Sequence, residues 1–291
     1  DSISSIQLVA RARKEGITLS ARDVVQKQTV AALALVAQPL TETTARAAIA
    51  ATGDLPMTPI MLDMIAQGGD WSRFQQSALL EIPGTDPDAL SAALNDLLDH
   101  HPILGARVTG KNVLHIPETP RQGEILTVIG VAALTGSEWD IGLKTAAAEA
   151  AARLDPEQGR LMQAVLFKAG DQARLLLTIH HLAVDGVSWR ILLPDLAEAL
   201  AARMNGRTPA LGVVTTPFRE WALAMPAAAR DRLDQLPLWH DIAGQRQQPL
   251  TERPLDPAID CFGTQSLLHV SLDAATTEAL MTHATRRIGG G

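Results

Sequence analysis

The chain has 291 residues, of which 46 % are hydrophobic and 20 % are charged. This composition supports a buried core, excludes a disordered chain, and suits one large domain with an appendage or two domains. The formal net charge of -7, without a cluster of Lys and Arg, argues against nucleic acid as a partner. The single cysteine, Cys261, cannot form an internal disulfide. Because no signal segment and no membrane-spanning apolar stretch is evident, we expect a cytoplasmic protein.

The first residues predict a small helical unit over 1–38. Gly16 is a stop signal for the first helix, and Ser20 with Asp23 three positions later resembles a capping box. Thr29 is a suitable cap for the apolar segment that follows. The first helix itself is indicated by apolar residues at helical spacing: Ile3, Ile6, Val9 and Ala10.

Beyond residue 38 the pattern changes twice. Residues 39–54 are polar and rich in Ala and Thr, which predicts a linker. Strands are then expected at 76–82, 161–167 and 173–179, and helices at 87–100, at 144–153 and after Ser188. One face of the helix at 87–100 is apolar: Leu90, Ala93, Leu94, Leu97 and Leu98. This succession predicts an α/β sandwich in which helices cover a mixed sheet.

Two adjacent histidines end the last expected strand, in the stretch IHHLAVDGVSW of residues 179–189. Because neighbouring side chains of a strand point to opposite faces, His180 and His181 cannot both address one cavity. One of them can do chemistry while the other packs. An imidazole both takes and gives a proton near neutral pH, with an ordinary pKa of about 6.5, so a proton-transfer site is one interpretation.

The loop after the histidines has residues that suit a constrained turn. Asp185 can accept hydrogen bonds in the turn or pair with an arginine, and Gly186 permits a backbone conformation denied to other residues. Ser188 is a natural N-cap for the next helix, and Trp189 can bury its ring beneath the loop. Pro194 should kink that helix or mark where its regular part begins.

Spacing alone leaves three interpretations of the double histidine open. The first takes both histidines as hydrogen-bonded polar residues at a strand end. The second uses His181 and Asp185 as metal ligands, but no further His or Cys lies at a standard motif spacing. The third is the proton-transfer site.

The segment HHLAVDG matches the HHxxxDG motif of the condensation superfamily of nonribosomal peptide synthetases, whose members resemble chloramphenicol acetyltransferase in fold. Further segments resemble the family in the same order: LPMTPIM, FQQSALLEI, LLDHHPILGARV, LDPEQGRLMQAVLF and TTPFREWA. The resemblance covers residues 55 to about 270 discontinuously. The continuation VDGVSWRIL, with Ser188 and Trp189 directly after Gly186 and Val187, is more similar to epimerization domains than to amide-forming condensation domains.

The N-terminal helices resemble the latter part of a peptidyl carrier protein, in which DSI would end the GGDSI motif. The resemblance implies that Ser2 carries a covalent phosphopantetheine, and Asp1 before it is typical of carriers that serve epimerization domains. It divides the chain into a partial carrier at 1–38, a linker at 39–54, the N-terminal lobe of an epimerization domain at 55–234, and the start of an incomplete C-terminal lobe at 235–291.

The family's roles transfer residue by residue. By resemblance, His181 is the catalytic acid/base, His180 and Asp185 are structural, and Arg107 pairs with Asp185. A second catalytic group, a glutamate in the downstream lobe, is not expected before residue 291. The chain departs from the family pattern at Gly105, where another arginine is common, and in the PIM segment, where Met61 replaces Gln and Asp63 replaces Trp.

The resemblance implies L-to-D epimerization of an aminoacyl or peptidyl thioester on the carrier's phosphopantetheine arm. It also implies an adenylation domain upstream and a condensation domain downstream as partners, and no metal. An amide-forming condensation domain is the nearest alternative, and a non-catalytic module that docks carriers is a further one.

Overall fold

The computed structural model describes residues 4–5, 8–9, 11–12, 15–39, 50–119, 123–212, 214, 216–245, 253, 256 and 258–289. The chain divides into two compact units, Asp1–Leu233 and Asp234–Gly291, and each is considered by itself. Among the described helices, none combines the length and apolar character needed to traverse a lipid bilayer.

The N-terminal segment contains two short capped helices, α2 (Ala21–Lys27) and α3 (Val30–Ala34), flanked by the paired strands β1 (Ile17–Thr18) and β2 (Gln38–Pro39). Ser20 and Asp23 form the predicted capping box: the Asp23 amide donates to Ser20 Oγ over 3.1 Å, and the Ser20 amide donates to Asp23 Oδ2 over 2.9 Å. Thr29 caps α3 by accepting from the Ala32 amide. Both capping predictions are confirmed.

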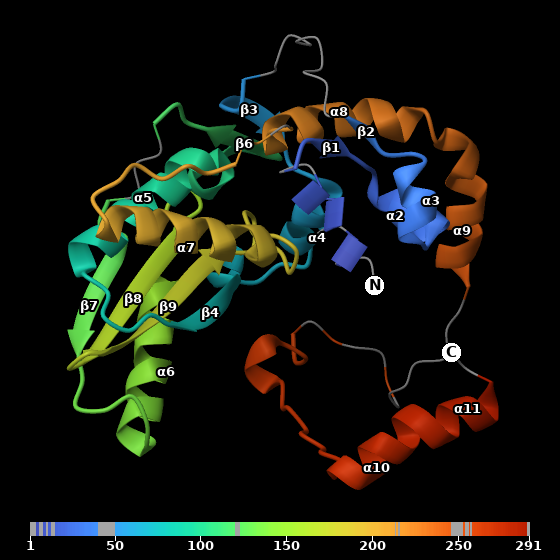
Figure 1. Ribbon diagram of the computed structural model, residues 1–291. Coiled ribbons are helices and arrows are strands. Elements are labelled where there is room, and N and C mark those ends of the chain that lie inside the picture. The colour runs from blue at the N-terminus through green and yellow to red at the C-terminus, as the bar shows by residue number, and fades with distance from the viewer. Residues whose placement is uncertain are drawn as a thin grey trace. The chain divides into compact units, whose positions relative to one another are not determined.

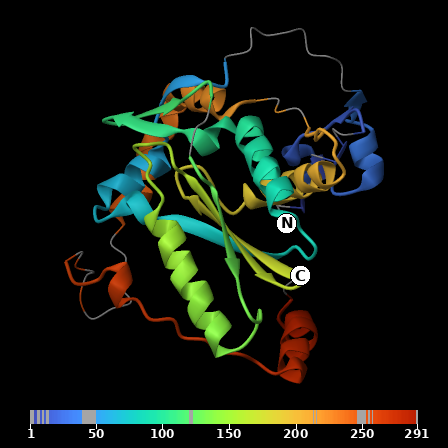
Figure 2. The same cartoon turned by 90° about the vertical axis from the view of Figure 1, so that its left-hand side faces the viewer.

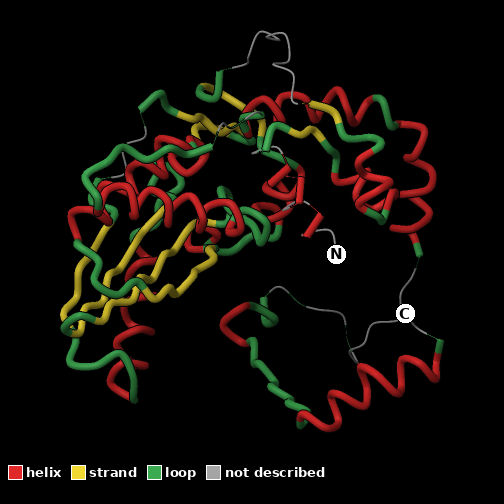
Figure 3. Tube along the Cα trace, in the orientation of Figure 1, coloured by secondary structure: helices red, strands yellow, loops and turns green. Residues whose placement is uncertain are grey.

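A four-stranded sheet forms the centre of the first unit, in the order β4-β9-β8-β7 (Figures 1 and 3). Its strands are β4 (Gln75–Glu81), β7 (Leu126–Gly130), β8 (Met162–Ala169) and β9 (Gln172–His180). Strands β7 and β8 run parallel, while β8 with β9 and β9 with β4 are antiparallel. The parallel pair is joined through helix α6 (Ser137–Ala152), as a crossover connection requires. The predicted mixed sheet is confirmed.

Helices cover both faces of this sheet (Figure 2). Helices α5 (Pro87–His100) and α7 (Trp189–Met204) pack on one face and α6 on the other. The side chains of β8 point alternately to the two faces of the sheet. Met162, Ala164 and Leu166 face α5 and α7, whereas Val165 and Phe167 face α6. Helix α5 has the predicted bounds and buried face, but α6 begins seven residues before the predicted 144–153, because Trp139 is buried edge-on against Phe167 and holds the first turn on the sheet.

A second, smaller sheet has the order β3-β6-β5, formed by β3 (Gly53–Pro56), β5 (Arg107–Gly110) and β6 (Val113–Ile116). Helices α4 (Pro59–Ala66) and α8 (Phe218–Arg230) enclose a separate apolar cluster with it, and the short 3-10 helices η1 (Trp71–Arg73) and η2 (Pro102–Gly105) connect the two sheets. Strand β3 starts inside the segment expected to be a linker, whose residues 40–49 lie outside the described part of the chain.

The second unit contains α9 (Leu236–Gly244), α10 (Ala274–Ala279), the π-helical turn η5 (Leu280–Ala284) and α11 (Thr285–Ile288). Two 3-10 turns, η3 (Leu233–Gln235) and η4 (Phe262–Thr264), complete the elements. Of the residues described from 234 onward, none is buried. This unit therefore has helices without an apolar core of its own in the described part.

Candidate active site

His180 is the last residue of β9 and is completely buried. Its Nε2 lies 2.9 Å from the Trp71 carbonyl oxygen, and the Leu182 amide donates to its Nδ1 over 3.1 Å. Burial, together with the nearby charge of His181, lowers the pKa of His180 to about 4, although the bond to the Trp71 carbonyl raises it. His180 is therefore a neutral ring that donates from Nε2 and joins β9 to η1.

His181 lies in the turn after β9 and is only half-buried. Its backbone amide donates to the Phe74 carbonyl over 2.9 Å, and its ring stacks on the Phe74 ring at a centroid distance of 4.9 Å with 10° between the planes. Its Nε2 lies 3.1 Å from Nε2 of Gln76. The two adjacent histidines thus occupy different surroundings, and His181 has the exposure that a proton-transfer group needs.

Asp185 closes the loop through hydrogen bonds to its own neighbours. Its Oδ1 accepts from the Val187 amide over 3.0 Å and from the amide and hydroxyl of Ser188 over 2.8 and 2.7 Å, while the Asp185 amide donates to Ser188 Oγ. Burial raises the pKa of Asp185, but the hydrogen bonds from Ser188 and Val187 outweigh it, so the pKa lies below its ordinary value. The ionised carboxylate therefore holds the loop.

The predicted pair between Arg107 and Asp185 is not formed among the described residues. Arg107 begins β5, and its buried Nε has no hydrogen-bond partner there. Its side chain instead lies against Gly159, where an added Cβ would stand 2.8 Å from Arg107 Cγ. The hydrogen bonds that the Asp185 carboxylate accepts in the described part of the chain come from its own turn, where Oδ1 accepts from Val187 and Ser188.

Ser188 occupies the N-cap position of α7 as expected, whereas its side-chain bond and the conformation of Gly186 differ from the expectation. Ser188 stands directly before α7, but its side chain makes no capping bond, because the hydroxyl is already bonded to Asp185. Gly186 does not adopt the left-handed conformation, and a Cβ there would meet no atom within 4 Å. Asp185 supplies the capping instead, since it accepts from the two amides that precede the helix.

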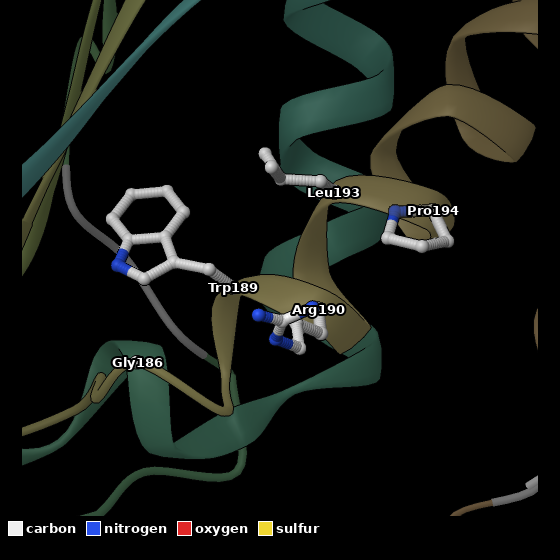
Figure 4. Close-up of a pocket in the computed structure, with 5 residues that line it drawn as sticks. All are labelled: Gly186, Trp189, Arg190, Leu193 and Pro194. Carbon is white, nitrogen blue, oxygen red and sulfur yellow. The ribbon is translucent and has the colours of Figure 1, made fainter. Parts of the chain in front are cut away.

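An open hollow lies beside this loop, lined by Gly186, Trp189, Arg190, Leu193 and Pro194 (Figure 4). The indole of Trp189 forms its strand side and is partly buried against the core between the sheet and α7. Helix α7 continues through Pro194, which has no N–H to donate to the preceding turn. Gly186 borders the hollow on the side of the loop.

Trp189 also leads to a residue that sequence reasoning missed. Its Nε1 donates to Gln76 Oε1 over 2.7 Å, and Gln76 in turn contacts His181. Gln76 lies on β4 opposite Ile179, so it shares a face of the sheet with the residues two positions away on β9. The expected strand at 76–82 included Gln76, but only the register of β4 against β9 places it beside His181.

Comparison with known proteins identifies the family. Residues 66–286 match the condensation domain family, and residues 1–36 match the phosphopantetheine attachment site. This chain belongs to the condensation-domain family. The predicted order, a carrier segment followed by a domain of the condensation superfamily of nonribosomal peptide synthetases, is confirmed, and phosphopantetheine is its covalent cofactor.

The chain has relatives among large synthases. It is 33 % identical to a linear gramicidin synthase of Brevibacillus parabrevis over 97 % of this chain and 4 % of that protein. It is 32 % identical to chondramide synthase of Chondromyces crocatus over 99 % of this chain and 8 % of that protein. The chain thus spans a small fraction of the length of these relatives.

The fold of the condensation domain matches a solved structure, the epimerization domain from the third module of tyrocidine synthetase B. The TM-score is 0.69 at 24 % identity, and the match covers 84 % of this chain and 57 % of that one. The predicted α/β fold of the condensation and epimerization type is thereby confirmed.

The structure leaves the predicted attachment residue untested and places its one metal-compatible group of described residues away from the double histidine. Ser2, with Asp1, falls outside the residues that the structure describes. Among the described residues, His100, His101 and Asp195 are close enough together to hold a metal ion, and they do not include His181 or Asp185. His101 Nε2 already bonds Asp195 Oδ2 over 2.8 Å, which ties the end of α5 to α7.

Proposed function

We propose that this condensation-family domain inverts the Cα centre of an aminoacyl or peptidyl thioester during nonribosomal peptide synthesis. The observation that carries the proposal is the contrast between the two adjacent histidines. His180 is buried and uses both ring nitrogens to hold the fold, whereas His181 is half-buried, with its ring oriented by Phe74 and Gln76. The fold match to an epimerization domain and the segment VSWRIL support epimerization in particular.

In this reaction the Cα–H bond breaks, its electron pair moves into the thioester as an enolate, and the proton passes to the His181 imidazole. A proton then returns to Cα on the opposite face, so that only the configuration changes. The thioester acidifies the Cα–H bond, but the carbon remains a much weaker acid than imidazolium, so the site must also stabilise enolate charge. The opposite face needs a second acid, for which the family resemblance predicts a glutamate in the downstream lobe.

The substrate is delivered by the carrier segment. We propose Ser2 as the attachment residue, since DSI matches the end of the carrier motif. The phosphopantetheine arm supplies the sulfur of the thioester and raises the local substrate concentration by tethering. We propose an adenylation domain upstream and a condensation domain downstream as partners, in the cytoplasm and without nucleic acid, membrane or metal.

The test is proton exchange in the intact protein. A phosphopantetheinyl transferase transfers the aminoacyl-phosphopantetheine of an aminoacyl-coenzyme A to the serine and releases adenosine 3′,5′-bisphosphate. After incubation in deuterated water and release of the amino acid, deuterium at Cα and the D/L ratio are measured. The wild type should take up deuterium and form both stereoisomers. His181→Ala should be slower by about 10²–10⁴-fold, the usual contribution of a general acid/base. Ser2→Ala should prevent loading.

Other outcomes identify the alternatives. Amide formation with an offered acceptor carrier, without deuterium uptake, would establish the condensation reaction instead. Neither reaction, with binding of the loaded carrier retained, would indicate a docking module. Unchanged exchange in a folded His181→Ala variant would remove this histidine from the chemistry.

A further inference from the structure

Gln76 forms a bridge between the proposed catalytic histidine and the tryptophan of the VSW segment. Its Oε1 accepts from Trp189 Nε1 over 2.7 Å, and its Nε2 lies 3.1 Å from His181 Nε2. The three residues come from β4, from α7 and from the turn after β9. Strand pairing brings Gln76 and His181 together across 105 positions of sequence.

The donor and acceptor properties of these groups determine the direction of each bond. An indole N–H can only donate, so the Gln76 atom that faces Trp189 must be the amide oxygen. The amide nitrogen then faces His181, and an amide NH₂ can only donate. His181 Nε2 must therefore accept, which means that it carries no hydrogen, and the hydrogen of the neutral ring lies on Nδ1.

We propose that Gln76 and Trp189 are positioning residues that hold neutral His181 in the Nδ1–H tautomer and so make Nε2 the nitrogen that takes up a proton. The identification of that proton with the substrate's Cα proton rests on the proposed function; the tautomer itself does not. The proposal assigns a role to Trp189, whose side chain acts through Gln76 rather than on the substrate.

The surroundings of His181 support a defined ring orientation. Its ring is stacked on Phe74, and its backbone amide is bonded to the Phe74 carbonyl, so the ring plane and the main chain are both held. Nε2 has a single lone pair, which accepts from the Gln76 amide, so Gln76 must release it before a proton can be taken up there. The protonated nitrogen is then a donor that opposes the Gln76 amide nitrogen. Gln76 must then move aside or turn its oxygen toward His181, and turning breaks the bond that Trp189 donates. The Gln76 amide orientation is thus coupled to the proton on Nε2.

The test reads the tautomer directly in the 291-residue chain labelled with ¹⁵N. Long-range ¹H–¹⁵N correlation spectra, recorded at a pH where imidazoles are neutral, distinguish a protonated from an unprotonated ring nitrogen. The His181 signals are identified by their loss in His181→Ala. We expect Nδ1–H in the wild type. Gln76→Glu replaces the amide donor with an acceptor of nearly the same shape, so the hydrogen should move to Nε2. Trp189→Phe removes the donor that orients the amide, so both tautomers should appear.

The matched control is Gln75→Glu, on the neighbouring position of β4. Gln75 pairs with His180 on the other face of the sheet and accepts from Ser77 Oγ over 2.7 Å. This variant should leave the His181 signals unchanged, and circular dichroism should show that all variants are folded. Nε2–H in the wild type, or Nδ1–H retained in a folded Gln76→Glu variant, would overturn the proposal. If the tautomer is as expected but no deuterium exchange occurs in the intact protein, the tautomer stands and epimerization fails.

Discussion

The two units of the chain differ in how they surround a leucine side chain. The comparison is between Leu177 on strand β9 of the first unit and Leu268, which follows helix α9 in the second. Leu177 is 0 % exposed and belongs to the core between the sheet and helices α5 and α7, whereas Leu268 is 89 % exposed. The first unit thus has apolar cores enclosed between layers, although some of its apolar side chains are also exposed. The described part of the second unit displays its own to solvent: Leu236, Leu238, Trp239, Ile242, Ile259, Leu267, Leu268, Val270, Leu272, Leu280, Met281 and Ile288.

The difference shows that apolar content alone does not stabilise a unit. Burial of apolar surface contributes about 25 cal/mol per Å², and only a second layer removes that surface from water. Helices α10 and α11 have caps and turns but no covering layer in the described residues. We therefore expect local unfolding to occur at lower free energy in the second unit than in the first.

The largest expected effect is the difference in free energy of unfolding between alanine substitutions at the two leucines. Leu177→Ala leaves a cavity in a closed core and should lower the free energy of unfolding by about 2–5 kcal/mol. Leu268→Ala removes an exposed side chain and should change it by no more than about 0.5 kcal/mol. Urea unfolding followed by tryptophan fluorescence measures both, with buried Trp139 as a reporter of the first unit. If the free energy of unfolding falls equally in the two variants, Leu268 is covered by other residues in solution.

The second prediction uses the buried titratable group of the first unit. His180 has a pKa of about 4 when folded, below its ordinary unfolded value of about 6.5. Between these two pH values the unfolded chain binds more protons than the folded chain. The contribution of His180 to the free energy of unfolding is therefore fully present above about pH 6.5 and is lost as the pH falls toward 4, a total loss of about 3 kcal/mol.

Replacement of His180 isolates this contribution. His180→Gln cannot titrate, so its free energy of unfolding should depend less on pH between 7 and 4.5, although its stability at pH 7 is lower because a buried bond to Trp71 or Leu182 is lost. Denaturant titrations at several pH values measure the slope. If wild type and variant have the same slope, His180 does not carry the acid sensitivity.

The third prediction compares helix caps in the two units. Asp86 caps α5 by accepting from the Ala89 amide, and Asp273 caps α10 by accepting from the Thr276 amide, both over 2.9 Å. Asp86→Ala should destabilise the first unit by about 0.5–2 kcal/mol, because α5 is part of its core. Asp273→Ala should reduce helical circular dichroism and leave the unfolding of the first unit unchanged. A shift of that transition in Asp273→Ala would show that the units are coupled.

The smallest effect concerns a surface ion pair on the sheet. Arg174 Nη2 lies 3.1 Å from Glu81 Oε1, and the Glu81 side chain is 76 % exposed. Glu81→Gln should lower the free energy of unfolding by no more than about 1 kcal/mol, and the difference should shrink at high salt. A loss above about 2 kcal/mol that is independent of salt would show that the pair is far better shielded than its exposure indicates.

Much of the fold was predictable because its signals are local. The bounds and buried face of α5 follow from apolar spacing between a cap and a proline-containing turn, and the caps Ser20 and Thr29 need only residues three positions away. The early start of α6 was not predictable, because the contact between Trp139 and Phe167 joins a helix to a strand. The Arg107 pairing failed for a similar reason: the hydrogen bonds of Asp185 depend on the conformation of the loop.

The sequence by itself determined that a strand ends in two histidines, that their side chains point to different faces, and that a turn with Asp185 follows. These properties depend on strand periodicity and on nearest neighbours along the chain. Only the tertiary structure decided which atoms meet those faces. It placed Trp71 at His180 and placed Phe74 and Gln76 at His181, because the register of β4 against β9 joins segments that are far apart in sequence. The physical reason is that register is set by burying one face of each strand in a shared core, which no short stretch of sequence contains.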